Sequence, residues 1–144
     1  MISQTAEYAL RAVVFLGETS GTRWTTKVIA EATQIPPGYL AKVMQSLAQA
    51  GIVSAQRGFN GGFALLRPPE EVSVYEVMQV IDPIKRIREC PLKLAAHAEH
   101  LCPLHSRLDD ALGQIEESFR SSTVYDLLTR PTFCPAESRV EEEA

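Results

Sequence analysis

Residues 37–66 read PGYLAKVMQSLAQAGIVSAQRGFNGGFALL. The first part of this stretch predicts a helix that begins at Pro37 and ends before Gly51, because proline suits the first turn of a helix and glycine the residue that follows one. Lys42 and Gln45 would lie on the exposed face of this helix. The apolar residues recur at three- and four-residue spacing and predict the buried face: Leu40, Val43, Met44, Leu47 and Ala48.

The second part of the stretch predicts a β-hairpin. Residues 52–56 and 63–66 are rich in β-branched and apolar side chains, as short strands are. Between them stands RGFNGG (57–62), whose glycines permit the positive φ angles of a tight turn. The helix at 37–49 is therefore followed by two short antiparallel strands.

Two further helices are predicted before this stretch. Apolar residues at helical spacing over 8–16 indicate the first. Thr25 or Thr26 can cap the second, over 27–33, and residues 34–36 form a short turn before the next helix. Two helices joined by a tight turn, followed by a hairpin, make a winged helix-turn-helix. The expected fold class is mainly α with a small β-hairpin wing.

A long amphipathic helix is predicted from Pro103 to about Arg120. At 1.5 Å per residue it would run about 27 Å, which is too long for a small winged helix to bury. We expect it to act as a C-terminal dimerisation helix, with residues 123–128 folding back as a cap; packing within one subunit is the alternative. The apolar stripe comprises Leu104, Leu108, Ala111, Leu112, Ile115 and Phe119.

Charge is distributed unevenly along the chain of 144 residues, whose net charge is −4. Residues 1–67 hold six Lys/Arg and three Glu, whereas residues 68–144 hold eight basic and fifteen acidic residues. A basic N-terminal half on an acidic protein favours contact with a polyanion. No apolar run reaches the ~20 residues that span a bilayer, and residues 1–5 do not resemble a signal peptide. We expect a cytoplasmic protein without a membrane segment.

A winged helix can place its third helix in the major groove of double-stranded DNA and its wing against the backbone or the minor groove. Lys42 would contact a phosphate, since it is a point charge, and Gln45 can read a base edge. The alternative for each position is an ordinary solvated surface of a small α+β domain. The predicted DNA-contacting residues are Tyr39, Lys42, Gln45 and Arg57.

Two Cys-Pro pairs form the second informative feature, Cys90-Pro91 and Cys102-Pro103. A residue before proline avoids the α region, and proline suits the first helical position, so each cysteine is predicted at a helix N-cap. The helix dipole and unsatisfied amide groups there favour thiolate. His105 follows Cys102 by three residues, on the same helix face. This set suits a soft metal ion or an iron–sulfur cluster, unless both cysteines are simply small apolar residues at helix ends.

Other chemistries fit the same residues. Zinc would want four ligands, and His97 or His100 could complete a set with the two cysteines and His105. A reversible disulfide between Cys90 and Cys102 is a second option. Catalysis is not expected, because a thiolate and an imidazole without a third orienting group do not make an active site.

At this point the chain resembles the winged-helix, redox- and iron-sensing bacterial regulators typified by IscR and NsrR. The resemblance runs from Met1 to about Leu128. It implies a homodimer on a pseudo-palindromic operator, and an iron–sulfur cluster whose presence or redox state alters DNA binding. Its strongest elements, beside the cysteine region, are residues 7–11, 39–44, 51–63 and 74–82.

The resemblance also implies the ligands of that cluster. Ala96 stands where the family usually has a middle cysteine, so too few thiolates remain for a [4Fe–4S] cluster and a [2Fe–2S] cluster is expected. Glu7 occupies the place of an acidic residue that, in some relatives, the partner subunit supplies as the fourth ligand. His97 and His100 are alternatives to it. The three ligands carried over directly are Cys90, Cys102 and His105.

The predicted organisation has four parts. Residues 1–82 form the winged-helix domain, 83–102 the cluster-binding loop, 103–128 the dimerisation helix and cap, and 129–144 a flexible acidic tail. Cys134 lies in that tail and is not expected to be a ligand.

Overall fold

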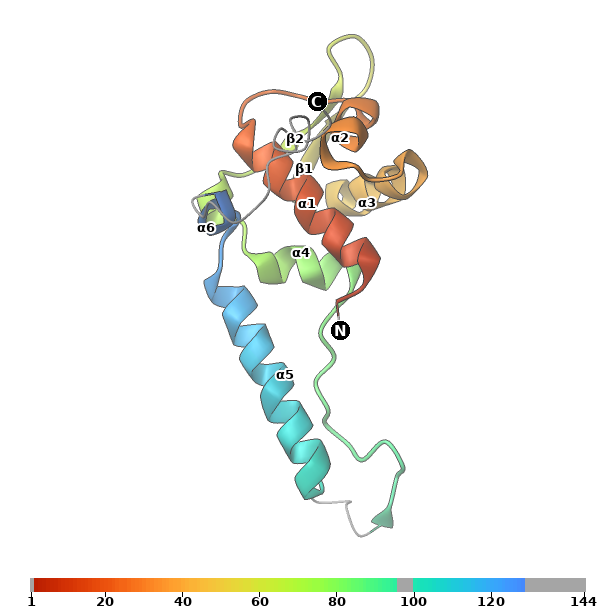
Figure 1. The fold of residues 1–144 in the computed structure, drawn as a ribbon, viewed down its shortest axis with the longest axis vertical. Coiled ribbons are helices and arrows are strands. Elements are labelled where there is room, and N and C mark those ends of the chain that lie inside the picture. Colours follow the sequence, from red (N-terminus) through yellow and green to blue (C-terminus); the bar gives the residue numbers. More distant parts are fainter. Residues whose placement is uncertain (1, 96–99, 129–144) are drawn as a thin grey trace, which may run out of the picture.

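The structure is a computed structural model that describes residues 2–95 and 100–128. Three helices and then two strands open the chain, which is the order of a winged helix-turn-helix and confirms the predicted fold class (Figure 1). These elements are α1 (Gln4–Glu18), α2 (Thr26–Thr33), α3 (Pro37–Gln49), β1 (Val53–Gln56) and β2 (Gly62–Leu65).

Local side-chain hydrogen bonds set the ends of the first helices. Ser3 caps α1, with its Oγ accepting a hydrogen bond from Ala6 N at 3.2 Å. Thr25, rather than Thr26, caps α2, because its Oγ1 accepts from Val28 N at 3.3 Å. Gln34 then takes the left-handed conformation, φ 59°, which ends α2 and turns the chain toward α3.

The core is built around α1, which packs against α2, α3, α4, α6 and β2. The predicted buried face of α3 is confirmed, since four of its five apolar residues are buried and Ala48 is half-buried. Apolar side chains from these elements fill one continuous cluster, whose largest fully buried members include Leu16, Ile29, Leu40, Met44 and Leu47.

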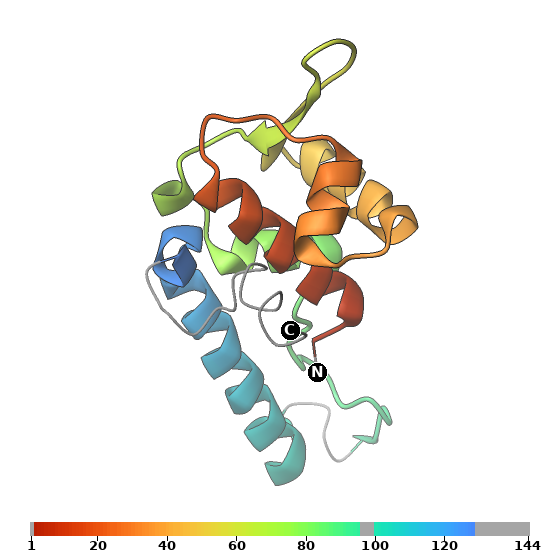
Figure 2. The ribbon, with the colours of Figure 1, turned by 45° about the horizontal axis from the view of Figure 1, so that its top comes forward.

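The wing projects from the end of this core as a two-stranded antiparallel hairpin (Figure 2). Its register pairs Val53 with Leu65 and Gln56 with Gly62. Trp24 adds a β-bridge to Phe63, with N···O distances of 3.0 and 2.8 Å. The base of the wing is thereby fastened to the segment before α2.

After β2 the chain forms η1 (Pro69–Glu71) and α4 (Val74–Ile81). The last described helix, α6 (Val124–Leu128), comes back to the winged helix. The N–H of Val124 donates to the carbonyl of Val72 at 2.8 Å, and the Val124 side chain is fully buried. Gly17 makes room for it, because a Cβ at Gly17 would lie 3.1 Å from Val124 Cγ1. Residues 123–128 therefore fold back onto the winged helix.

Helix α5 (Pro103–Ser121) stands away from the core in both Figure 1 and Figure 2. Its contacts with the core are made mainly with α4. None of its 19 residues, all of which the structure describes, is buried. No helix within residues 2–95 and 100–128 is long and apolar enough to cross a membrane.

A bidentate ion pair fastens the segment after α4 to the side of α5. Arg86 donates from Nε and Nη2 to the two carboxylate oxygens of Asp109, at 2.7 and 2.8 Å, and Ile87 N adds a bond of 2.9 Å. The guanidinium lies over Gly113, where a Cβ would be 3.0 Å from Nη1. Hydrogen bonding from Arg86 lowers the pKa of Asp109 from 3.8 to about 2.

We predict that Asp109→Asn releases this segment from α5, because a neutral amide cannot accept both guanidinium hydrogen bonds as a carboxylate does. Hydrogen exchange of the amides at 84–90 should quicken. In the unmodified protein the fastening should be complete above about pH 4 and weaken as pH falls through about 2, since the folded-state pKa of Asp109 is the depressed one. Asp110→Asn, on the exposed surface of the same helix, is the control; equal exchange in both variants would contradict the assignment.

Candidate nucleic-acid interface and metal site

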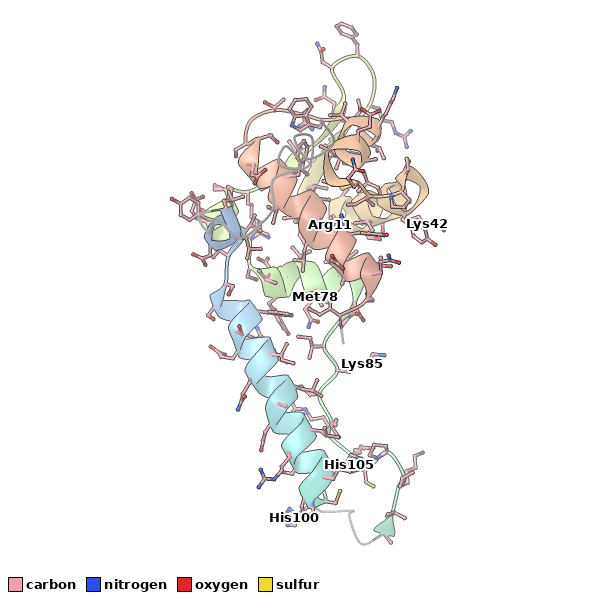
Figure 3. All side chains as sticks on the ribbon, viewed as in Figure 1. Arg11, Lys42, Met78, Lys85, His100 and His105 are labelled. Carbon is pink, nitrogen blue, oxygen red and sulfur yellow. The ribbon has the colours of Figure 1, made fainter. Side chains whose placement is uncertain are left out.

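Helix α3 presents the predicted DNA-contacting residues on the face opposite to its buried stripe. Tyr39, Lys42 and Gln45 follow one another at three-residue intervals and are exposed, Tyr39 by 59%. Figure 3 labels Lys42 on the outer side of α3. Arg57 is exposed where β1 enters the turn of the wing. All four side chains are thus accessible to a ligand, as a nucleic-acid contact requires.

The charge around these residues is of one sign. From residue 32 to residue 69 the sequence holds no Asp or Glu, while it holds Lys42, Arg57 and Arg67. This stretch covers the whole of α3 and the wing. A surface without carboxylates lets a phosphate backbone approach without local repulsion.

Helix α1 holds the start of α3 and the end of α2 in place. Arg11 donates from Nη1 to the carbonyl of Thr33, the last residue of α2, at 2.7 Å, and its guanidinium lies 5.4 Å from the ring centre of Tyr8. The ring of Tyr8 in turn lies 6.2 Å from that of Tyr39. The sequence analysis missed this role of Arg11; a charged residue inside the apolar run of α1 was the available signal.

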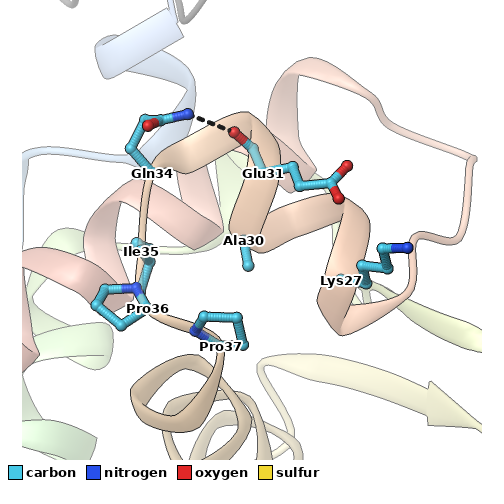
Figure 4. Close-up of a pocket in the computed structure, with 7 residues that line it drawn as sticks. All are labelled: Lys27, Ala30, Glu31, Gln34, Ile35, Pro36 and Pro37. Atoms are coloured by element: carbon cyan, nitrogen blue, oxygen red, sulfur yellow. Dashed lines mark hydrogen bonds between the residues drawn. The ribbon is translucent and has the colours of Figure 1, made fainter.

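The turn between α2 and α3 borders an open hollow of about 540 Å³ (Figure 4). Ile35, Pro36 and Pro37 form one side, and Lys27 and Glu31 lie on α2 at the other. Apolar atoms predominate in its lining, and it lies between the two helices of the helix-turn-helix. We interpret this hollow as a consequence of how the turn separates the two helices.

Cys102 occupies the N-cap of α5, as predicted. Its φ and ψ are −62° and 161°, and its Sγ accepts a hydrogen bond from His105 N at 3.5 Å. The same sulfur lies 3.1 Å from Nδ1 of His105. The prediction that Cys102 and His105 share one helix face is therefore confirmed.

Cys90 does not cap a helix, and the prediction that it does is wrong. The carbonyl of Cys90 accepts a hydrogen bond from Lys93 N at 2.9 Å, which closes a turn over Pro91 and Leu92. Lys93 then adopts φ 51°, a left-handed conformation that cannot continue into a helix. Proline at the second position suits a turn as well as a helix start, so the Cys-Pro pair alone could not distinguish them. The Cys90 side chain is buried, with 7% exposure.

The remaining candidate ligands are dispersed. Glu7 is exposed in the first turn of α1, where its carboxylate lies 3.9 Å from Arg11 Nε. His100, which Figure 3 labels, is exposed just before the N-terminus of α5. Within residues 2–95 and 100–128, no three His, Cys, Asp or Glu side chains are placed so that they could hold a metal ion. Ala96, His97 and Cys134 lie outside the described residues.

The sequence analysis also missed the contact that positions the predicted cluster-binding loop (83–102). Asp109 lies outside the predicted apolar stripe of the long helix, and its bond to Arg86 pairs residues 23 positions apart. Gly113 gave a signal, because glycine inside a helix costs about 1 kcal/mol relative to alanine and often marks a close approach.

Comparison with known proteins agrees with this architecture. Residues 2–130 match the family described as "Rrf2: Iron-dependent Transcriptional regulator". A putative HTH-type transcriptional regulator of Aquifex aeolicus is 28% identical over 131 residues, covering 89% of this chain and 91% of that protein. The HTH-type transcriptional regulator NsrR of Geobacillus kaustophilus is 31% identical over 133 residues, covering 88% of each.

Solved structures show the same fold. IscR of T. potens is 25% identical, with a TM-score of 0.73 over 89% of this chain and 85% of that one. CymR, the global cysteine regulator of B. subtilis, is 24% identical and has a TM-score of 0.73 over 89% of this chain and 95% of that one. The matched family, the winged-helix fold and the absence of carboxylates from α3 and the wing all indicate a protein that binds DNA. The chain belongs to the Rrf2 family and is a DNA-binding transcriptional regulator.

Proposed function

We propose that this regulator binds DNA as a homodimer and that a [2Fe–2S] cluster sets its affinity for DNA. The proposed ligands are Cys90, Cys102 and His105 of one subunit and Glu7 of the partner subunit. When bound, the cluster would supply a reversible redox couple. The observation that carries the proposal is the pairing of Cys102 with His105 at the N-terminus of α5.

The geometry of this pair suits a shared metal centre. A sulfur and a nitrogen bound to one tetrahedral metal ion lie about 3.5 Å apart, as bond lengths of about 2.3 and 2.0 Å require. Cys102 Sγ and His105 Nδ1 lie 3.1 Å apart, so a small side-chain rotation suffices. The helix N-terminus behind Cys102 also favours an anionic ligand there.

The length of the chain would allow Cys90 to reach the same end of α5. The ion pair fixes Arg86 against Asp109, seven residues or about 10 Å along the helix from Cys102. Cys90 follows Arg86 by four positions, and an extended chain of that length spans at most about 13 Å. The anchored segment therefore supports Cys90 as a third ligand, with a fourth supplied from outside this group.

The exposed apolar side of α5 supports the homodimer. Leu104 and Leu108 are 64% and 47% exposed, although they belong to the apolar stripe. A groove of about 590 Å³ lies beside this helix and is lined by Met78, Ile84 and Phe119, among others. A second copy of the chain would cover these side chains, and its α1 could then present Glu7.

A route from Glu7 to the DNA-contacting face runs through α1. The Glu7 side chain is 64% exposed, and its carboxylate lies 3.9 Å from Arg11 Nε. The carboxylate therefore remains accessible to a metal centre. Arg11 holds the end of α2, and Tyr8 packs against Tyr39 on α3. A change at Glu7 would thus act directly on the helix that fastens both parts of the helix-turn-helix.

We predict that Lys42→Ala and Arg57→Ala each weaken DNA binding several-fold and lower the slope of log Kd against log salt by about one, because each removes one phosphate contact. Gln45→Ala should relax base preference at one position. The probe is a duplex selected from a random pool by the unmodified protein, and the measurement is fluorescence anisotropy at several salt concentrations. Lys85→Ala, which removes an exposed lysine beside α5, is the matched control (Figure 3). Unchanged affinity for both Lys42→Ala and Arg57→Ala would refute the proposed docking.

We predict that the double variant Leu104→Glu, Leu108→Glu is monomeric, because two carboxylates in an apolar helix interface would be desolvated without partners. Sedimentation equilibrium measures the mass. Leu66→Glu, at a position 57% exposed after β2, should leave the dimer intact. A dimeric double variant would place the interface elsewhere.

We predict that Cys90→Ala and Cys102→Ala each abolish cluster assembly, since each removes a thiolate ligand. Iron, sulfide and visible absorption would be measured on anaerobically purified protein. Cys134→Ala, which also removes one thiol, should retain the cluster. Normal iron and sulfide in both ligand variants would show that the site lies elsewhere.

The same measurement tests the fourth ligand. Glu7→Ala should leave a cluster with an altered spectrum or stability, whereas Glu18→Ala at the other end of α1 should not. If Glu7→Ala matches the unmodified protein, the ligand must be sought at His97 or His100. A colourless unmodified protein, with zinc or without metal, would replace the cluster with the zinc or thiol alternative.

A further inference from the structure

Phe59 is the most exposed of the large apolar side chains described, at 95%. It lies at the tip of the wing, the part of the molecule that projects farthest from the core on that side (Figures 1 and 2). A phenyl ring left in water at a hairpin tip gains nothing from the fold of its own chain. Its position is therefore better explained by a ligand than by folding.

The tip that carries Phe59 is a defined turn. Gly61 N donates to the carbonyl of Gly58 at 2.9 Å, which places Phe59 and Asn60 at the two central positions. Asn60 has φ 60°, as the third residue of a type II turn requires. A side chain at the first central position projects from the end of the hairpin.

Contacts of the neighbouring residues also fix the backbone that carries this turn. A Cβ at Gly61 would clash with the carbonyl oxygen of Gln56, so the backbone there is tightly folded. Arg23 donates from Nη1 to the carbonyls of Ser54 on β1 and Gly62 on β2, at 3.3 and 3.4 Å, and so links the two strands. A ring presented on such a support loses little conformational entropy when it binds.

The residues around the Phe59 ring indicate which kind of ligand it would contact. Arg57 is exposed two residues away, and no carboxylate occurs between residues 32 and 69. The wing and α5 project at opposite ends of the molecule, so a dimer formed through α5 would leave Phe59 uncovered (Figure 1). An apolar ring beside a cation, on the same side as α3, suits the groove of a polyanion whose backbone that cation contacts.

We propose that Phe59 is an apolar wedge that enters the minor groove of DNA and partly unstacks one base step. The proposal rests on the docking of α3 and the wing proposed above. Proteins that bind the minor groove commonly insert such side chains, and pyrimidine–purine steps yield most easily. The wing thereby adds specificity for a deformable step, which Arg57 alone, as a phosphate contact, cannot supply.

The first test separates an apolar contact from an ionic one. Using the duplex selected from a random pool, Phe59→Ala should bind roughly tenfold more weakly, in line with the loss of a base–aromatic contact. The slope of log Kd against log salt should stay unchanged, whereas Arg57→Ala should lower it by about one. Phe59→Leu should recover part of the affinity, because leucine also serves as a wedge. Tyr125→Ala, which removes an exposed aromatic ring on α6, should bind as the unmodified protein does.

The second test locates the ring. A 2-aminopurine moved through the selected duplex should brighten at one step on binding of the unmodified protein, and not with Phe59→Ala. A G·C pair placed at that step should weaken binding, and an inosine·C pair should restore it, because only guanine places an amino group in the minor groove. Phe59→Ala should respond equally to both pairs.

Three results would overturn the inference. One is an affinity of Phe59→Ala within twofold of the unmodified protein. Another is a lower salt slope in Phe59→Ala, which would indicate a lost phosphate contact. The third is a changed oligomeric state in Phe59→Ala, which would make the ring a contact between protein subunits. Since Lys42→Ala and Arg57→Ala are measured on the same duplex, failure of the wedge is distinguishable from failure of the docking itself.

Discussion

Helix α1 can be closely enclosed by its neighbours because small side chains alternate with larger ones on its buried face. Ala6, Ala9 and Ala12 are each at most 1% exposed, and Gly17 leaves space for α6. Close approach of several backbones to one helix needs such residues, since larger ones would hold the neighbours apart. The helix-turn-helix, the base of the wing and the returning C-terminal helix all lie against this one element. A displacement of α1 would therefore reach each of them.

The molecule has two regions with different sources of order. The winged helix is held by a continuous apolar cluster, whereas the segment after α4 is held to α5 by hydrogen bonds that Arg86 and Ile87 N donate to Asp109. A region that buries few apolar side chains opens at low free energy, and elements that respond to ligands are drawn from such regions. Cys90 and Cys102 lie in this second region, and the proposed DNA-contacting residues lie in the first. Glu7, Tyr8 and Arg11 belong to α1, which packs against α4, and α4 contacts α5.

The proposed DNA interface combines two kinds of contact. Helix α3 offers polar side chains at regular intervals over a rigid apolar core, which suits recognition of base edges. The wing offers a cation and an aromatic ring on a backbone fixed by glycines and by Arg23. Neither part carries a carboxylate, although the chain as a whole is acidic. Net charge thus says little about the partner here; its distribution along the chain says more.

The sequence alone determined the winged helix, the long C-terminal helix and the N-cap role of Cys102, because each depends on periodicity, capping and turn residues within a few positions. Only the tertiary structure decided that Cys90 closes a turn, that α6 completes the core, and that Arg86 grips Asp109 over Gly113. The same holds for Arg11, which reaches the end of α2 from α1. Apart from the turn at Cys90, where a Cys-Pro pair suits a turn as well as a helix start, these features pair residues distant along the chain. No local pattern encodes which distant residue a side chain will meet. The same reason applies to the proposed ligands of the cluster, because the fourth of them belongs to another subunit.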